Sequence, residues 1–217
     1  MEFPGCMRAA QSRRRFFQTA AASALILAPA AEAADAPQPN VLGPWPGYSP
    51  HIGTLVSEMT WMRAAVLKTV QGMTQPQLDF LLDEKANRIG ALLAHLAATE
   101  KLYQANTFDD ASIMAIYTNA KYKDILVPMN LGDPARASIK GHDLPYYLDL
   151  LKETREKTLA EFRKRDDAWL LSIDKAFVWG PTDNLCKWFH VCEHESHHSG
   201  QIALLAGRVP GGKPQNG

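Results

Sequence analysis

The sequence predicts an all-α fold, a four-helix bundle with a long connection between its second and third helices. Apolar residues recur three and four positions apart in four long segments, and no segment alternates apolar and polar residues as a half-buried strand does. The composition, 46% hydrophobic and 21% charged over 217 residues, suits one globular domain. The formal net charge of zero gives no reason to expect a nucleic-acid partner, because a phosphate-binding surface needs a basic excess.

The first helix is expected to begin at Ser49, a favoured N-cap residue, with Pro50 at the first helical position. It should end near Gly72. Its apolar stripe is Ile52, Leu55, Val56, Met59, Met62, Val66 and Val70. Thr74, with a glutamine three positions later, resembles a capping box and predicts a short turn through Leu82.

The second helix is predicted from Asn87 to Asn106, and His95 lies at the margin of its apolar stripe. Residues 107–142 are the least regular part, with a turn signal at Gly132-Asp133-Pro134. A connection of this length in a compact domain is usually functional. We therefore expect it to cover a site and to select the substrate.

The third helix is predicted from Leu144 to Leu171, and the charged residues between Lys152 and Asp167 are expected on a solvated face. After an irregular segment at 172–182, Asp183-Asn184 should cap a last helix that ends near Gly207. The bundle domain is thus assigned to residues 49–210, and residues 211–217 to a C-terminal tail.

The first residues resemble an export signal rather than part of the fold. Ser12 to Gln18 carry a twin-arginine pattern, an apolar stretch runs from Thr19 to Ala31, and Ala31-Glu32-Ala33 is a small-x-small cleavage site. We assign residues 1–33 to a twin-arginine signal peptide and residues 34–48 to a proline-rich lead-in. The stretch is shorter than the roughly 20 apolar residues of a membrane anchor. The expected partner is the twin-arginine export machinery, and the expected location is the periplasm or otherwise outside the cytoplasm.

Two cysteines lie on the last predicted helix. Cys186 and Cys192 are six residues apart, which corresponds to a rise of about 9 Å. A disulfide needs Cα atoms within about 7 Å of each other. These two cysteines are therefore predicted not to bridge.

The last helix also carries histidines at positions that should face the bundle. An unpaired buried polar group costs about 1–3 kcal/mol, so something should satisfy these imidazoles. His194 and His198 are four residues apart, hence on one face of the helix, where both rings can reach one metal ion. Glu195 between them is not interpreted as the base of a zinc protease. It stays, with Glu100 and His190, among the candidates for a general base.

Two runs resemble a known family. His190 to Ile202 is similar to the C-terminal signature of DinB-like proteins, and Asn87 to Glu100 is similar to their second-helix signature. The resemblance covers about residues 50–209. It implies a four-helix bundle with one divalent metal ion held, by position, by His95, His194 and His198. Zinc, nickel, manganese and iron all stay open for such a site.

Other residues near these runs have less specific interpretations. His190 is a candidate second-shell partner or alternative ligand, and Gln201 a candidate contact to the site. Gly200 is expected to allow close helix packing, and His197 to face solvent. Glu100 is more simply solvated than catalytic.

The resemblance leaves three functions open, and no catalytic residue is assigned. The first is a metal-dependent transferase that binds a small-molecule thiol as thiolate, and the second is a hydrolase that uses metal-bound water. The third is a non-catalytic, exported metal-binding or stress-associated protein, because fold resemblance does not settle chemistry. A homodimer is an open option, since dimers are common among such bundles.

Overall fold

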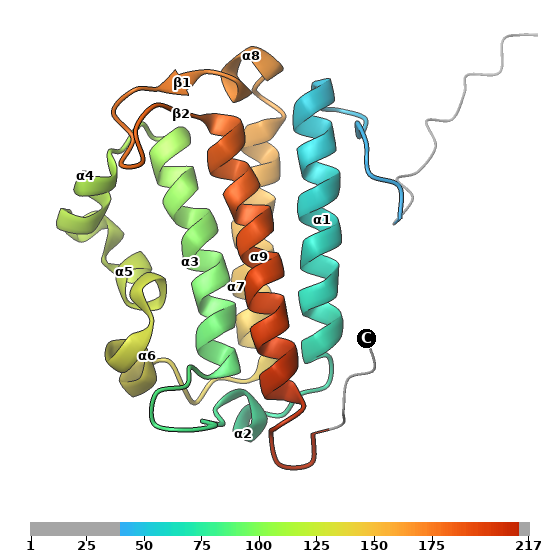
Figure 1. Ribbon diagram of the computed structural model, residues 1–217, viewed down its shortest axis with the longest axis vertical. Helices are drawn as coiled ribbons and strands as arrows, with labels where there is room; N and C mark the ends of the chain where they lie inside the picture. Colours follow the sequence, from blue (N-terminus) through green and yellow to red (C-terminus); the bar gives the residue numbers. More distant parts are fainter. Residues whose placement is uncertain (1–39, 213–217) are drawn as a thin grey trace, which may run out of the picture. The chain divides into compact units, whose positions relative to one another are not determined.

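The computed structural model describes residues 40–212, and its main feature is a bundle of four long helices (Figure 1). These helices are α1 (Pro50–Val70), α3 (Ile89–Thr107), α7 (Leu144–Phe162) and α9 (Asn184–Ala206). The predicted all-α bundle is confirmed. The predicted signal peptide lies outside the described residues, as do residues 34–39 of the lead-in and residues 213–217 of the tail.

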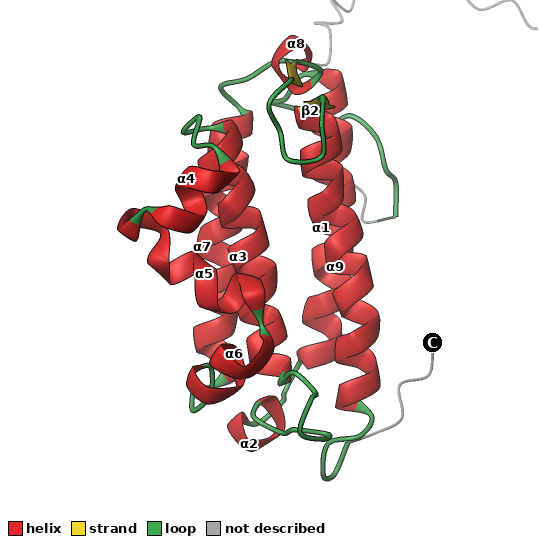
Figure 2. Ribbon diagram, turned by 60° about the vertical axis from the view of Figure 1, so that its left-hand side comes forward, coloured by secondary structure: helices red, strands yellow, loops and turns green. Residues whose placement is uncertain are grey.

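The four helices follow one another around the bundle in the order α1, α9, α3, α7. Figure 2 shows α1 and α9 side by side, with the short helices α4 (Ile113–Thr118), α5 (Lys123–Asn130) and α6 (Gly132–Ser138) on the α3 side. Because α3 packs against α9, α7 and α5, it is covered on nearly every side. Each of its residues except Lys101 is buried, and His95 is among them.

The start of α1 is capped from a distant segment. Ser49 precedes the helix as predicted, but its side chain makes no cap bond within α1 and instead donates to Asp167 at 2.5 Å. The Asp167 carboxylate accepts from the backbone N–H groups of His51 and Ile52 at 3.1 and 3.2 Å. These N–H groups lack partners within the helix, so a carboxylate there stabilises the helix end.

The connection at residues 107–142 is more regular than the sequence predicts. It contains α4, the 3-10 turn η1 (Ala120–Tyr122), α5 and α6. A turn with positive φ at Leu131 and Gly132 separates α5 from α6. The connection therefore forms an ordered layer on α3.

The third helix is shorter than predicted. It ends at Phe162, and a separate helix α8 (Asp167–Leu170) follows because the Asp166 side chain accepts from the Trp169 N–H and caps a new start. Two strands of two residues each, β1 (Ile173–Asp174) and β2 (Thr182–Asp183), pair in antiparallel fashion before α9, and the sequence does not predict them. The short helix α2 (Gln75–Leu78) has the predicted capping box at Thr74.

Several predictions about burial are wrong. The charged face of α7 is not uniformly solvated, because Arg155 is 8% exposed. Glu100, expected in solvent, is fully buried. Gly200 lies beside open space and packs no helix closely; Gly90 does, since an added Cβ would lie 2.6 Å from the Tyr147 hydroxyl.

The two cysteines of α9 are both free, as the helical rise predicts. Cys192 is buried and Cys186 is exposed. Among the described helices none combines the length and apolar character that a membrane crossing requires.

Candidate metal centre

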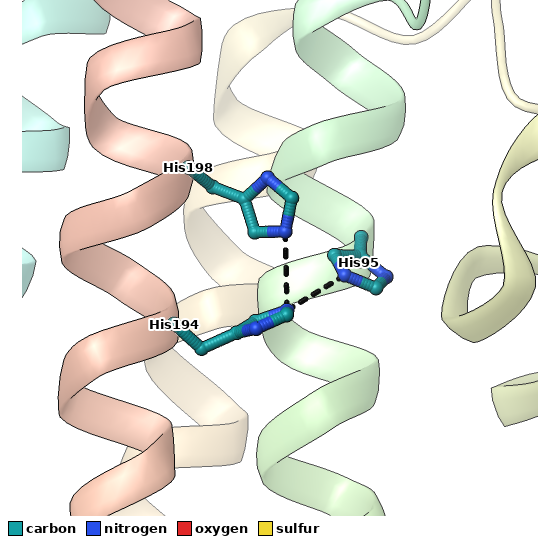
Figure 3. A group of neighbouring side chains, drawn as sticks. All are labelled: His95, His194 and His198. Atoms are coloured by element: carbon teal, nitrogen blue, oxygen red, sulfur yellow. Dashed lines mark hydrogen bonds between the residues drawn. The ribbon is translucent and has the colours of Figure 1, made fainter.

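Three histidine side chains from α3 and α9 converge inside the bundle (Figure 3). His95 lies in the middle of α3, while His194 and His198 lie one turn apart on the facing side of α9. The Nε2 atom of His194 is 2.7 Å from Nε2 of His95 and 3.1 Å from Nε2 of His198. The helix packing thus brings three ring nitrogens from two distant segments to one point.

Partners on the other ring nitrogens fix two of the three tautomers. Nδ1 of His95 lies 2.9 Å from the carbonyl oxygen of Pro128, and Nδ1 of His198 lies 2.8 Å from Oε1 of Gln201. A carbonyl or amide oxygen only accepts, so both Nδ1 atoms carry the hydrogen. In a neutral imidazole the Nε2 atom then bears a lone pair, and two such lone pairs point at His194.

Burial keeps these rings neutral. His95 and His198 are 5% and 7% exposed, and His194 is partly exposed. Burial lowers the pKa of His95 to about 4, and burial together with the neighbouring imidazoles lowers the pKa of His194 to about 3. Burial likewise lowers the pKa of His198. Near neutral pH the three rings are therefore uncharged and able to donate lone pairs.

The donor set fits a divalent transition metal ion. The Nε2 atoms of His95 and His198 both direct a lone pair at His194. A neutral His194 has one Nε2–H and can donate it to only one of them, so the other lone pair has no hydrogen-bond donor among the three histidines. An ion shared by the three nitrogens uses all the lone pairs at once. Each Nδ1–H held by an oxygen is the arrangement that metal-ligating histidines usually show. The three nitrogens do not select among zinc, nickel, manganese and iron.

A comparison with protein families identifies the family of the chain. The model of the family described as mycothiol-S-transferase matches residues 54–211. The chain belongs to this family. Because mycothiol S-transferases are DinB-like proteins, the predicted resemblance is confirmed. A comparison with curated proteins finds no match.

Within this mycothiol-S-transferase fold, the run His194 to His198 has the His-Glu-x-x-His spacing of zinc proteases, in which the glutamate is a general base. The surroundings of Glu195 exclude that role. Its side chain is 2% exposed and forms ion pairs with Arg63 and with Arg155, the latter at 2.7 Å. Burial and the two guanidinium groups on Oε1 make Glu195 a member of an internal ion-pair network rather than a group that faces a substrate.

Glu100 is engaged in the same way, so it too is removed as a candidate base. Its carboxylate accepts from Arg155 Nε at 2.8 Å, from Arg63 Nη2 at 3.0 Å and from the Thr158 hydroxyl at 2.6 Å. Burial alone would raise the pKa of Glu100, but the two guanidinium groups outweigh burial and hold it below its usual range. Of the three candidates, His190 is the one that borders the histidine group, with its ring centroid 5.1 Å from that of His194.

The four charged residues Arg63, Glu100, Arg155 and Glu195 form a buried quartet with one member on each long helix. Glu195 directly follows His194, so the quartet fixes the rotation of α9 about its axis and thereby the direction of the two histidines. Sequence reasoning did not identify this quartet. The available signals were Arg63 at a stripe position of α1 and Glu100 in an otherwise apolar run.

Two further α9 residues, His197 and Gln201, lie where their predicted roles require. His197 is exposed, as predicted. Gln201 contacts the site through His198, and its Nε2 lies 3.3 Å from Nε2 of His197.

Proposed function

We propose that this chain is a metal-dependent thiol S-transferase in which His95, His194 and His198 hold one divalent ion. The observation that carries the proposal is the convergence of the three Nε2 atoms with two tautomers fixed by Pro128 and Gln201. The matched family points to a low-molecular-weight thiol of the mycothiol class as one substrate. The second substrate is an electrophile that accepts the sulfur.

A divalent ion held by three neutral imidazoles supplies a Lewis acid that lowers the pKa of a thiol and stabilises the thiolate. The reaction joins the thiol sulfur to an electrophilic carbon, the leaving group departs with its bonding electrons, and the thiol proton passes to solvent. The chain's own residues hold the geometry: Pro128 and Gln201 orient two ligand rings, and the buried quartet orients α9. The three ligand rings are uncharged, so they would not offset the charge of a bound ion.

The connection at residues 107–142 is proposed to select the electrophile. Its helix α5 packs on α3, and Pro128 contacts His95 directly. Met129, the next residue, receives a hydrogen bond from Thr99 at 3.7 Å, one turn along α3 from His95. Met129→Ala, which keeps Pro128, should change which electrophiles react while metal binding persists; unchanged selectivity would contradict this role.

Export by the twin-arginine route stays a proposal, supported by the pattern at Ser12 to Gln18. This route carries folded proteins, so it is compatible with a metal ion inserted before export. Fractionation of cells that produce the full chain, beside a variant with both Arg13 and Arg14 replaced by lysine, tests the proposal. Retention of the variant in the cytoplasm and release of the original chain are expected.

Metal analysis and cobalt spectroscopy test the function. The full chain is expected to bind one ion, and His95→Ala should lose it, whereas His142→Ala, which removes an exposed imidazole elsewhere, should retain it. In the cobalt-substituted protein, a small thiol should change the visible absorption as sulfur enters the coordination shell. A protein that binds cobalt yet shows no spectral response to any thiol would contradict the transferase proposal, and turnover of simple esters by that protein would favour a hydrolase.

A further inference from the structure

A second group of metal-binding side chains lies on α9 beside the three-histidine site. His190, Glu193 and His194 each offer one ligand atom, and these atoms all lie within 4.8 Å of one another. Glu193 and His194 lie three and four positions after His190, so each of them is a helical neighbour of His190. His194 belongs to both groups.

The new group is open to solvent where the first group is not. The side chains of His190 and Glu193 are 29% and 50% exposed, whereas His95 and His198 are 5% and 7% exposed. Nε2 of His190 is 3.9 Å from Oε2 of Glu193, which is too long for a hydrogen bond. Two ligands bound at about 2.0–2.2 Å to one tetrahedral ion lie roughly 3.5 Å apart, so a small side-chain movement would let both atoms bind one ion.

His190, like two of the inner histidines, has an oxygen atom beside its Nδ1. Its Nδ1 lies 2.8 Å from the hydroxyl of Tyr103, as Nδ1 of His95 faces Pro128 and Nδ1 of His198 faces Gln201. Tyr103 is 2% exposed and therefore a fixed partner. A hydroxyl can donate or accept, unlike a carbonyl oxygen. In the tautomer in which Nδ1–H donates to it, Nε2 keeps its lone pair, which is the usual support of a metal ligand.

The inner site by itself has no favourable means of capturing an ion. Its three ligands are neutral and two are buried, so a hydrated dication approaching it would lose water without meeting an opposite charge. Glu193 supplies a negative charge at the surface, and His190 supplies a nitrogen beside it. The nitrogen-only inner set then holds a borderline transition metal more tightly than a set containing a carboxylate.

We propose that His190, Glu193 and His194 form an outer loading site from which a divalent metal ion passes to His95, His194 and His198. The ion exchanges Glu193 and His190 for the two inner histidines while it stays bound to His194, so it never returns to water. This inference rests on the proposed metal site and adds an entry route to it. A loading site lowers the activation free energy of metal uptake and of metal release by the same amount. Its loss therefore slows both processes equally and leaves the equilibrium affinity for the metal unchanged.

The test follows cobalt uptake by the metal-free full chain in stopped-flow absorption, and cobalt release into excess chelator. Replacing His190 by alanine, or Glu193 by glutamine, should lower both rates by about tenfold, the scale on which supporting groups affect metal sites, with one ion still bound at equilibrium. Tyr103→Phe keeps the ring and removes only the hydroxyl, so it should slow both rates by a smaller factor. His142→Ala and Glu84→Gln remove exposed groups elsewhere and should change neither rate.

A second variant isolates the outer set. In the double variant His95→Ala, His198→Ala, the outer group should still bind one cobalt ion weakly, and adding His190→Ala should abolish that binding. Unchanged uptake and release in His190→Ala would overturn the loading route while the inner site stands. Two ions bound at once to the original chain would also overturn it, since His194 could not be handed from one to the other. Failure of the original chain to bind any cobalt would instead contradict the proposed function.

Discussion

Replacing Arg155 by methionine is expected to destabilise the bundle far more than the loss of a surface charge would. Arg155 donates through Nε to Glu100 at 2.8 Å, through Nη2 to Glu195 at 2.7 Å and through Nη1 to the carbonyl of Met59 at 2.9 Å. Methionine fills a similar volume, so the change removes charge and hydrogen bonds with little loss of packing. The quartet would then hold two carboxylates and one guanidinium group.

The size of the effect follows from which groups lose their partners. Glu100 is fully buried and keeps Arg63 and Thr158, whereas Glu195 keeps Arg63 and has, among the described residues, no hydrogen-bond partner on Oε2. Removing one member of a buried ion pair typically costs 3–5 kcal/mol because the remaining charge is uncompensated. For a domain of this size each kcal/mol lowers the melting temperature by about 2–4 °C, so a decrease of roughly 6–20 °C is expected.

Urea and thermal unfolding, followed by circular dichroism, measure this difference. The matched control is Lys152→Ala on the same helix, which removes an exposed pair with Glu156 at 3.9 Å and should cost less than about 1 kcal/mol. A loss of less than about 1 kcal/mol in Arg155→Met would refute the view that the quartet holds the four helices together. If the unpaired charge is the cause, adding Glu100→Gln to Arg155→Met should destabilise less than the sum of the two single changes.

Three further predictions concern the histidine site and α9. Burial lowers the pKa of His95 to about 4 and that of His194 to about 3, below the value near 6.5 of an unfolded chain, so the unfolded state binds more protons as the pH falls. The contribution of these two histidines to the free energy of unfolding of the metal-free protein should therefore be fully present above pH about 6.5 and be lost as the pH falls toward about 3. The melting temperature of His95→Gln should depend less steeply on pH over that range. Gln201→Leu removes the acceptor that orients the last ligand ring, so calorimetric titration should show metal affinity weakened by about 10–100-fold with the fold intact; an unchanged affinity would mean that this hydrogen bond does not support the ligand. Gly200→Ala should stabilise the protein by about 1 kcal/mol because its Cβ enters open space, whereas Gly90→Ala should destabilise it by about 1–3 kcal/mol because its Cβ would lie 2.6 Å from a buried tyrosine hydroxyl. Equal effects at the two glycines would contradict the packing described for α3.

The sequence alone predicts the features that depend on local periodicity. The four long helices follow from apolar residues spaced three and four apart, and the start of α9 follows from Asp183, whose side chain accepts from the backbone N–H three residues on. The pairing of His194 with His198 also follows from the sequence, because residues four apart share a helix face. The choice of His95 as their partner came from family resemblance, since no rule of spacing relates residues 99 positions apart.

Tertiary structure decided which polar residues are buried and what they contact. Arg155 and Glu100 look like ordinary surface charges in a sequence, and they are buried because charges on the other helices neutralise them. The carboxylate of Asp167, in the helix after the break at Phe162, caps α1, which is more than a hundred residues away. Whether a histidine nitrogen bears a lone pair toward its neighbours depends on the oxygen at its other nitrogen, and packing alone brought Pro128 and Tyr103 to those positions. Helix periodicity is a property of neighbouring residues, whereas neutralisation, capping from afar and tautomer choice are properties of contacts that exist only after the chain has folded.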